Sequence, residues 1–178
     1  MSKVKVHDKY FESFILFEKI QEAINSIATN INKDIEDVTP IFLVILNGSF
    51  MFAGDLLKKI SAPCEVSFVK LSSYVGTKST KKVKELIGFN EDIKGRSVII
   101  VEDIVDSGNT LENVLGQLNR MGAGDVKIAT LLFKPDAFEK SYKIDYIGIE
   151  IPDDFIVGYG LDYNNHGRNL KDIYKIVE

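Results

Sequence analysis

Three carboxylates follow a short apolar run near the middle of the chain. Glu102 and Asp103 come directly after the run 98–101, and Asp106 follows three residues later. The branched apolar composition of residues 98–101 is typical of a strand buried on both faces. Neighbouring carboxylates repel one another, and a turn that caps a helix needs only one such side chain. A plain capping turn therefore explains too little of this pattern.

The small residues after these acids have the composition of an anion site. The pattern predicts that a helix begins at these small residues, which are Ser107, Gly108, Asn109 and Thr110. Small residues let successive backbone N–H groups converge, the helix N-terminus adds partial positive charge, and the two hydroxyls are further donors. A phosphate cradle beside carboxylates suits a ligand with a phosphate and vicinal hydroxyls, accompanied by Mg²⁺. The residues predict a ribose 5-phosphate site.

Other kinds of phosphate site fit this turn less well. A P-loop needs a lysine directly after its last glycine, and no lysine follows Gly108. The glycine motif of dinucleotide-binding folds follows a strand, whereas residues 122–124 follow a predicted helix. Phosphotransferases of the haloacid-dehalogenase type need two aspartates separated by one residue, but two residues separate Asp103 and Asp106. The sugar-phosphate interpretation is therefore preferred.

Alternating strands and helices are predicted to hold this turn. Strands are predicted over residues 41–46, 65–71, 97–103 and 126–133, and helices over residues 13–34, 50–60 and 110–121. A polar connection joins the second strand to the third and ends at about residue 92. This order predicts an α/β fold with a central, mostly parallel sheet and helices on both faces. Ligands bind such sheets beyond the carboxyl ends of the strands.

The C-terminal part of the chain departs from this alternation. Two shorter apolar segments, 146–151 and 155–159, are separated by Pro152, and no long helix follows them. They predict a small hood subdomain built from about residues 135–178, together with the N-terminal segment. The length of 178 residues suits one domain, which we expect to span residues 1–178.

Composition limits the compartment and the partners. The net charge of −4 argues against a general nucleic-acid or anionic-membrane binder, because such proteins neutralise phosphates with basic residues. The longest apolar runs are far shorter than the roughly 20 residues of a membrane-spanning helix, and no signal peptide is recognised. Cys64 has no second cysteine to pair with, and His7 and His166 cannot complete a zinc site. We expect a cytoplasmic protein.

The acidic turn resembles the signature of the type I phosphoribosyltransferases. In that signature an apolar strand is followed by two acids, two apolar residues, Asp, Ser or Thr, Gly, any residue and Thr, as in residues 101–110. From about Ile41 onward the chain is similar to the hypoxanthine-guanine branch of this family. The resemblance implies Mg²⁺-dependent transfer of 5-phosphoribosyl from 5-phosphoribosyl 1-diphosphate to N9 of hypoxanthine or guanine, which forms IMP or GMP in purine salvage.

The resemblance also implies roles for the acidic turn. Glu102 and Asp103 hold the ribose hydroxyls and the water shell of the metal, and Asp106 is the general base that takes or shares the purine N7 proton. The 5′-phosphate is bound by Ser107, Gly108, Asn109 and Thr110.

Outside this turn, other segments match the family. Asn47 and Gly48 lie at the position of its diphosphate loop, although many members have Lys or Arg in place of Asn47. Ser73 and Tyr74 match a flexible loop that closes over the site. Lys134 matches a lysine that donates to the purine 6-oxo group. Taken alone, Lys134 is an ordinary lysine at a strand end.

The longest match covers residues 150–168. It implies that Phe155 stacks on the purine, the backbone of Ile156 reads its edge, Asp162 holds a second Mg²⁺ and lies in the purine half of the site, and Arg168 binds diphosphate. Without the resemblance, Phe155 is a core residue at strand spacing.

Two alternatives stay open at this stage. One is a relative that prefers xanthine, and the other is a non-catalytic regulator that binds nucleotide and RNA on the same fold. For the enzyme, the resemblance implies 5-phosphoribosyl 1-diphosphate and a 6-oxopurine as partners, without nucleic acid or membrane, and a homodimer or homotetramer.

Overall fold

The apolar runs of the chain form a twisted central sheet. The computed structural model describes residues 2–72, 84–87 and 92–177. Within these residues, the sheet has six strands in the order β5-β4-β3-β6-β7-β8. The strands are β3 (Ile41–Leu46), β4 (Glu65–Ser72), β5 (Lys84–Ile87), β6 (Val98–Val105), β7 (Val126–Phe133) and β8 (Tyr146–Glu150). All pairs are parallel except β4 with β5, so the predicted mostly parallel sheet is confirmed.

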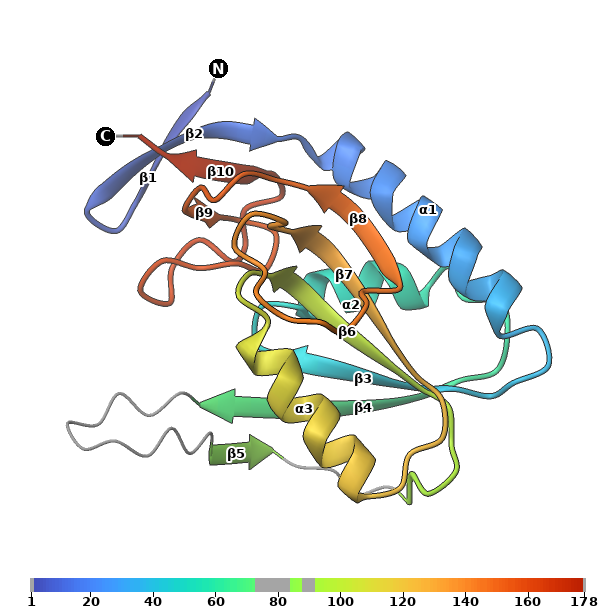
Figure 1. The fold of residues 1–178 in the computed structure, drawn as a ribbon. Helices are drawn as coiled ribbons and strands as arrows, with labels where there is room; N and C mark the ends of the chain where they lie inside the picture. The colour runs from blue at the N-terminus through green and yellow to red at the C-terminus, as the bar shows by residue number, and fades with distance from the viewer. Residues whose placement is uncertain (1, 73–83, 88–91, 178) are drawn as a thin grey trace.

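Helices cover both faces of this sheet, as predicted. Figure 1 shows α3 (Asn109–Arg120) in front of the sheet, and α1 (Phe17–Asp34) and α2 (Phe50–Leu57) behind it. Alternate residues of each strand supply the two cores, because side chains of a strand point to opposite faces in turn. Phe42 and Val44 of β3 pack with α1 and α2, whereas Leu43 and Ile45 pack with α3.

The predicted start of the first helix was wrong. The helix begins at Phe17, four residues after the predicted start, and the preceding residues belong to strand β2 (Lys9–Ile15). Phe11 and Ile15 are buried, and both positions also fit an alternating pattern. The apolar positions of this segment thus fit either a helix or a strand. Backbone pairing of β2 with β10 (Ile173–Ile176), from the other end of the chain, decides in favour of the strand.

A second sheet joins the two ends of the chain. In the part of the chain that the structure describes, its order is β1-β2-β10-β9, with β1 at Lys3–Val6 and β9 at Ile156–Val157. Figure 1 shows it beyond the carboxyl ends of the central strands, with both termini close together. The sequence predicts a hood built from the C-terminal segment together with the N-terminal one. However, its segment 146–151 forms β8, which pairs with β7 at the edge of the central sheet.

The strand order places a crevice between β3 and β6. From β3 the chain continues through α2 to β4 on one side, and from β6 it continues through α3 to β7 on the other. The two connections therefore diverge between these adjacent strands, which is the topological switch point where ligands bind in open α/β sheets. The turn after β3 and the acidic segment of β6 both reach this crevice.

Candidate active site

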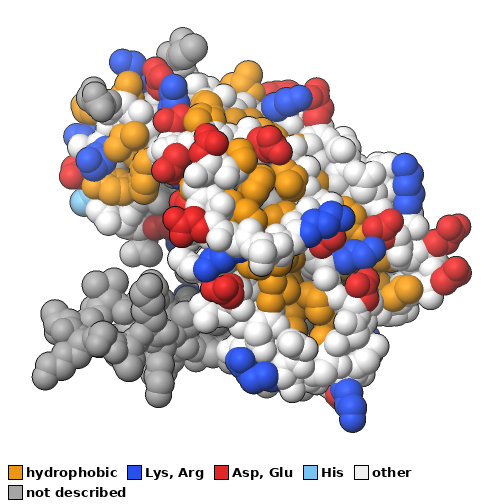
Figure 2. Space-filling model, viewed as in Figure 1, with side chains coloured by type: hydrophobic (Ala, Val, Ile, Leu, Met, Phe, Trp, Pro, Cys, Tyr) orange, Lys and Arg blue, Asp and Glu red, His pale blue; other side chains and the backbone are white. Residues whose placement is uncertain are grey.

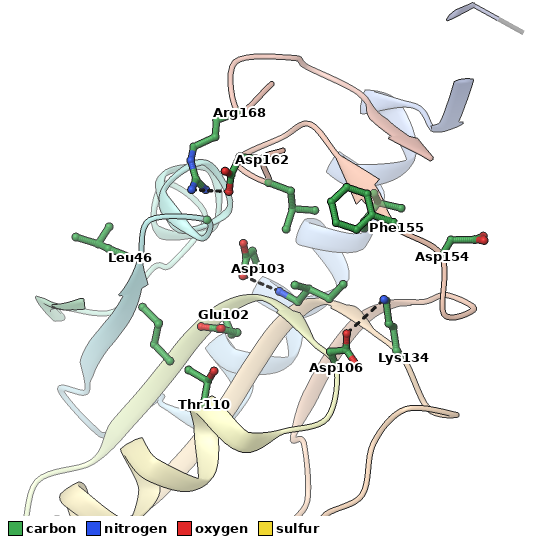
Figure 3. Close-up of a pocket in the computed structure, with 15 residues that line it drawn as sticks. Leu46, Glu102, Asp103, Asp106, Thr110, Lys134, Asp154, Phe155, Asp162 and Arg168 are labelled. Atoms are coloured by element: carbon green, nitrogen blue, oxygen red, sulfur yellow. Dashed lines mark hydrogen bonds and ion pairs between the residues drawn. The ribbon is translucent and has the colours of Figure 1, made fainter. Parts of the chain in front are cut away.

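A pocket of about 390 Å³ lies in this crevice, between the ends of β3 and β6 and the hood. Acidic side chains line much of it, namely Glu102, Asp103, Asp106, Asp154 and Asp162. Lys134 and Arg168 are its basic side chains among the described residues. Figure 3 shows Glu102 and Asp103 of β6 between Asp162 and Arg168 on one side and Asp106 and Lys134 on the other, with Asp154 directed away from them. Figure 2 shows acidic side chains on the surface between the second sheet and α3. The pocket is therefore suited to a ligand that brings positive charge, hydroxyl groups or a bound cation.

Glu102 lies within strand β6, in agreement with the strand predicted over residues 97–103. Strand β6 continues two residues past its predicted end because Ile104 and Val105 pair with β7. Glu102 consequently points to the α3 side, where it is 9% exposed and its Oε2 has no hydrogen-bond partner among the described residues. Burial, followed by the nearby charge of Asp103, raises the pKa of Glu102 well above its ordinary value. An unpaired buried carboxyl oxygen indicates a position where a ligand or cation would bind.

Asp103 points to the opposite face, toward the turn after β3. Its Oδ1 accepts a hydrogen bond from the Ile104 N–H at 2.9 Å. Burial raises the pKa of Asp103 to about 6, although this N–H and the charge of Arg168 act in the opposite direction. Gly48 packs so closely on the carboxylate that a Cβ at this position would overlap Oδ2. The glycine therefore lets the backbone approach the acid.

The hood supplies the charged pair opposite Asp103. Arg168 Nη2 contacts Asp162 Oδ1 at 2.6 Å, and Arg168 Nη1 donates to the Gly160 carbonyl at 2.7 Å. Gly160 has a φ of +99° and lies against the Gly48 carbonyl, without space for a side chain. Asp162 and Arg168 thus approach the turn after β3 from the hood (Figure 3).

Of the two residues predicted to bind diphosphate in the turn after β3, only one lines the pocket. Gly48 lines the pocket, but Asn47 is exposed and is not among its lining residues, and the Leu46-Asn47 peptide is cis. Ser49 is buried, and its hydroxyl donates to the Ile45 carbonyl. It does not cap α2 with its side chain.

Lys134 and Phe155 form the other half of the pocket. Lys134 is 7% exposed, and its Nζ donates to Asp153 Oδ1 at 2.7 Å and to Asp106 Oδ2 at 3.4 Å. Phe155 is 47% exposed, with the edge-on ring of Tyr163 at 5.8 Å between centroids. A large open aromatic face next to a buried ammonium suits a flat ligand that carries a hydrogen-bond acceptor.

The segment after β6 forms a second pocket of about 230 Å³ that shares Glu102, Ile104, Asp106 and Thr110 with the first. The remaining predicted cradle residues, Ser107, Gly108 and Asn109, also line it. The first helical hydrogen bond of α3 runs from the Glu112 N–H to the Gly108 carbonyl at 3.0 Å. The N–H groups of residues 109–111 consequently have no partner within the helix and can bind an anion. The N-cap of α3 is Gly108, and no side chain caps the helix.

Glu102 and Asp103 fit a cation that is shared with a ligand. Burial is the main cause of the raised pKa values of both carboxyls, and Glu102 Oε2 has no hydrogen-bond partner among the described residues, so a bound cation would stabilise their charged forms. Over the described ranges, however, no group of three His, Cys, Asp or Glu residues is arranged to hold a metal. Mg²⁺ commonly keeps several waters and binds one or two carboxylates together with phosphates of a substrate. The donor set therefore suits Mg²⁺ that arrives with a phosphorylated ligand.

Comparison with known proteins gives the family. The Phosphoribosyl transferase domain family matches residues 16–164. The hypoxanthine phosphoribosyltransferase of Salmonella typhimurium is 44% identical over 138 residues, which cover 77% of this chain and 78% of that protein. The chain belongs to the phosphoribosyl transferase family. The sequence-based resemblance to its hypoxanthine-guanine members is thereby confirmed.

Further relatives are similar to this phosphoribosyl transferase over most of their length. The hypoxanthine-guanine phosphoribosyltransferase of Lactococcus lactis is 41% identical over 165 residues, which cover 92% of this chain and 90% of that protein. A crystal structure of a hypoxanthine-guanine phosphoribosyltransferase from Bacillus anthracis superposes with a TM-score of 0.86 at 36% identity, covering 94% of this chain and 97% of that one. None of the helices that the structure describes has the length and apolar character needed to cross a membrane.

Sequence reasoning missed two residues next to these pockets. Asp153 contacts Lys134, and Tyr142 contacts the backbone of Gly108. Neither stands in the acidic signature, and only the tertiary fold brings them to the site. The predicted loop residues Ser73 and Tyr74 lie outside the described residues.

Proposed function

We propose that this protein is a purine salvage enzyme that transfers 5-phosphoribosyl from 5-phosphoribosyl 1-diphosphate to N9 of hypoxanthine or guanine. The products would be IMP or GMP and diphosphate. The observation that carries the proposal is the pair of joined pockets, one a phosphate cradle and the other lined by acids, Lys134 and an open aromatic ring. Relatives named for hypoxanthine and guanine support this choice of base.

The ribose 5-phosphate would occupy the pockets along β6. Backbone N–H groups and hydroxyls of residues 107–110 bind the 5′-phosphate, while Glu102 and Asp103 accept hydrogen bonds from the ribose hydroxyls. Fixing both ends of the sugar orients its reacting carbon toward the base. Orientation of this kind lowers a barrier by several kcal/mol in other positioned reactions.

The purine would lie between Phe155 and Lys134. Phe155 stacks on its ring, the Lys134 ammonium donates to the 6-oxo group, and the backbone of Ile156 reads its edge. Adenine has an amino group at this position, which cannot accept from an ammonium. Asp106 is 53% exposed in the shared wall of the pockets, where its carboxylate can take the N7 proton as general base.

The diphosphate would lie between the turn after β3 and the hood. Gly48 and Arg168 line this part of the pocket, where Gly48 would offer a backbone N–H group and Arg168 positive charge. The backbone N–H of Asn47, which is outside the pocket lining, would have to reach the diphosphate from the same turn. Glu102 and Asp103 would hold the water shell of one Mg²⁺ and Asp162 would hold a second, and this positive charge would neutralise the leaving diphosphate. Ser73 and Tyr74 are proposed to exclude water from the reacting sugar, as in the family pattern.

The decisive assay measures steady-state rates with hypoxanthine, guanine, xanthine and adenine in the presence of 5-phosphoribosyl 1-diphosphate and Mg²⁺. We expect turnover with hypoxanthine or guanine and none with adenine. Asp106→Asn should lower kcat by about 10²- to 10⁴-fold while binding of 5-phosphoribosyl 1-diphosphate is nearly unchanged. Preference for xanthine would replace the proposed substrate, and unchanged turnover in the variant would remove Asp106 from the mechanism.

The proposal includes self-association and a cytoplasmic location. Val66 and Phe68 share one face of β4 and are 41% and 45% exposed, which supports a homodimer or homotetramer. Light scattering of the purified protein measures the assembly. The single cysteine, Cys64, is consistent with a reducing cytoplasm.

A further inference from the structure

The connection from β7 to β8 packs against Gly108, a residue that lines the second pocket. Tyr142, in the middle of this connection, donates its hydroxyl to the Gly108 carbonyl at 2.6 Å. The two residues are 34 positions apart, and Figure 1 shows the connection passing by the N-terminal end of α3. The hydroxyl therefore reaches the helix N-terminus from outside the predicted phosphate loop.

Gly108 is enclosed by this connection. Its φ of +83° is in the left-handed region, which strains residues other than glycine. A Cβ at this position would lie 2.6 Å from the Tyr142 hydroxyl and 2.8 Å from both Lys140 Cγ and Phe138 Cε2. We call Phe138, Lys140 and Tyr142 the Gly108 clamp. Their side chains pack against this backbone segment, and Gly108 is buried beneath them.

The clamp is itself anchored on both sides. The rings of Phe138 and Tyr142 meet edge to face at 5.4 Å between centroids, and Phe138 makes the same kind of contact with Phe133 of β7 at 5.3 Å. Lys140 Nζ pairs with Glu112 Oε2 of α3 at 2.8 Å. Tyr142 is thus packed through Phe138 against the sheet and is hydrogen-bonded to the N-terminal end of α3.

The hydrogen bond fixes the direction of one peptide group in the cradle. In a trans peptide, the C=O of Gly108 and the N–H of Asn109 point in opposite directions. The Gly108 carbonyl accepts from both Tyr142 and the Glu112 N–H, so its direction is set by two donors. The Asn109 N–H is consequently directed away from the clamp.

The Tyr142 hydroxyl stays a hydrogen-bond donor at physiological pH. Burial, followed by the nearby charges of Glu112 and Glu102, raises the pKa of Tyr142 to about 12. The phenol therefore remains protonated and can donate.

We propose that Tyr142 is a positioning residue of the phosphate site, which it serves by holding the Gly108 carbonyl so that the Asn109 N–H faces the bound phosphate. This inference rests on the proposed function, because the phosphate concerned is the 5′-phosphate of the substrate and product. Tyr142 touches the loop and not the substrate, so its removal should weaken phosphate binding without affecting the base.

The test compares ligands with and without a phosphate in Tyr142→Phe. Isothermal titration of ribose 5-phosphate and IMP should give Kd values about five- to tenfold higher than in the unchanged protein, as expected for one lost hydrogen bond. The KM for 5-phosphoribosyl 1-diphosphate should rise similarly, whereas the KM for hypoxanthine at saturating 5-phosphoribosyl 1-diphosphate should not change.

Tyr146→Phe is a matched control. Tyr146 donates to Asp34 Oδ2 at the same distance of 2.6 Å, its pKa is also raised to about 12, and it lines neither pocket. This variant should leave phosphate binding unchanged, and thermal unfolding measures the loss of stability in both variants. Unchanged ribose 5-phosphate affinity in Tyr142→Phe, or an equal loss in Tyr146→Phe, would overturn the proposal. If the unchanged protein binds ribose 5-phosphate but transfers nothing to a purine, the proposed function fails while the role of Tyr142 is still measured.

Discussion

Replacing Asp103 with asparagine should stabilise the ligand-free protein at neutral pH. The pKa of this carboxyl is raised from its ordinary value of 3.8 to about 6, because burial disfavours its charged form. The folded protein therefore binds this proton more tightly than the unfolded chain. The resulting stability is fully present below about pH 4 and is lost as the pH rises through about 6.

The size of the expected gain in stability follows from the pKa shift of Asp103. A difference of about two pKa units corresponds to about 3 kcal/mol of unfolding free energy that is missing above pH 6. Asparagine has nearly the same shape and keeps an oxygen that can accept from the Ile104 N–H. It also removes the charge that contributes to the raised pKa of Glu102. We expect Asp103→Asn to be more stable than the unchanged protein by up to about 3 kcal/mol at pH 7.5.

Urea unfolding at pH 7.5 and at pH 4.5, with a chelator present, measures this difference. The gap between Asp103→Asn and the unchanged protein should shrink markedly at the lower pH. Activity should fall in the variant, since the proposed contact to the ribose and the metal is lost. A variant that is less stable at pH 7.5, or a gap independent of pH, would refute the conclusion that Asp103 is destabilised by its burial.

Asp55→Asn is a control for which we expect the opposite change in stability. Burial alone would raise the pKa of Asp55, but hydrogen bonds from Lys58, Tyr159 and Gln21 hold it below its ordinary value. Its contribution to stability is present above pH 4 and is lost as the pH falls through the lowered pKa. This variant should therefore be less stable than the unchanged protein at both pH 7.5 and pH 4.5.

Other contacts of the site lead to three further predictions. Gly48→Ala should raise the KM for 5-phosphoribosyl 1-diphosphate and lower Tm, since its Cβ overlaps the Asp103 carboxylate; an unchanged Tm would contradict the close packing. Phe155→Ala should weaken hypoxanthine binding by about 10- to 100-fold, measured as KM, because one stacked base contributes about 1–3 kcal/mol. Asp153→Asn should lower kcat about tenfold, because Lys134 then pairs with Asp106 alone, and Asp153→Glu should restore it. Equal rates in both Asp153 variants would show that this carboxylate does not position Lys134.

Local signals in the chain were sufficient for the order of β3, α2, β4, β6, α3 and β7. The branched apolar run before Glu102 predicted a buried strand, and the small residues after Asp106 predicted a helix N-terminus that binds an anion. Both signals depend on neighbours in sequence, so they can be interpreted without a structure. The end of β6 could not be predicted in this way, because its last residues are held by pairing with β7.

Contacts between distant parts of the chain decided which side chains of the site are paired. The sequence by itself determined the α/β fold class, the acidic signature and the resemblance to the phosphoribosyl transferases. The tertiary structure alone decided that Lys134 lies between Asp106 and Asp153, and that the Tyr142 hydroxyl donates to the Gly108 carbonyl. These pairings join residues 19 to 34 positions apart, with no local pattern that marks them. Only the packing of strands, helices and connections brings such groups together.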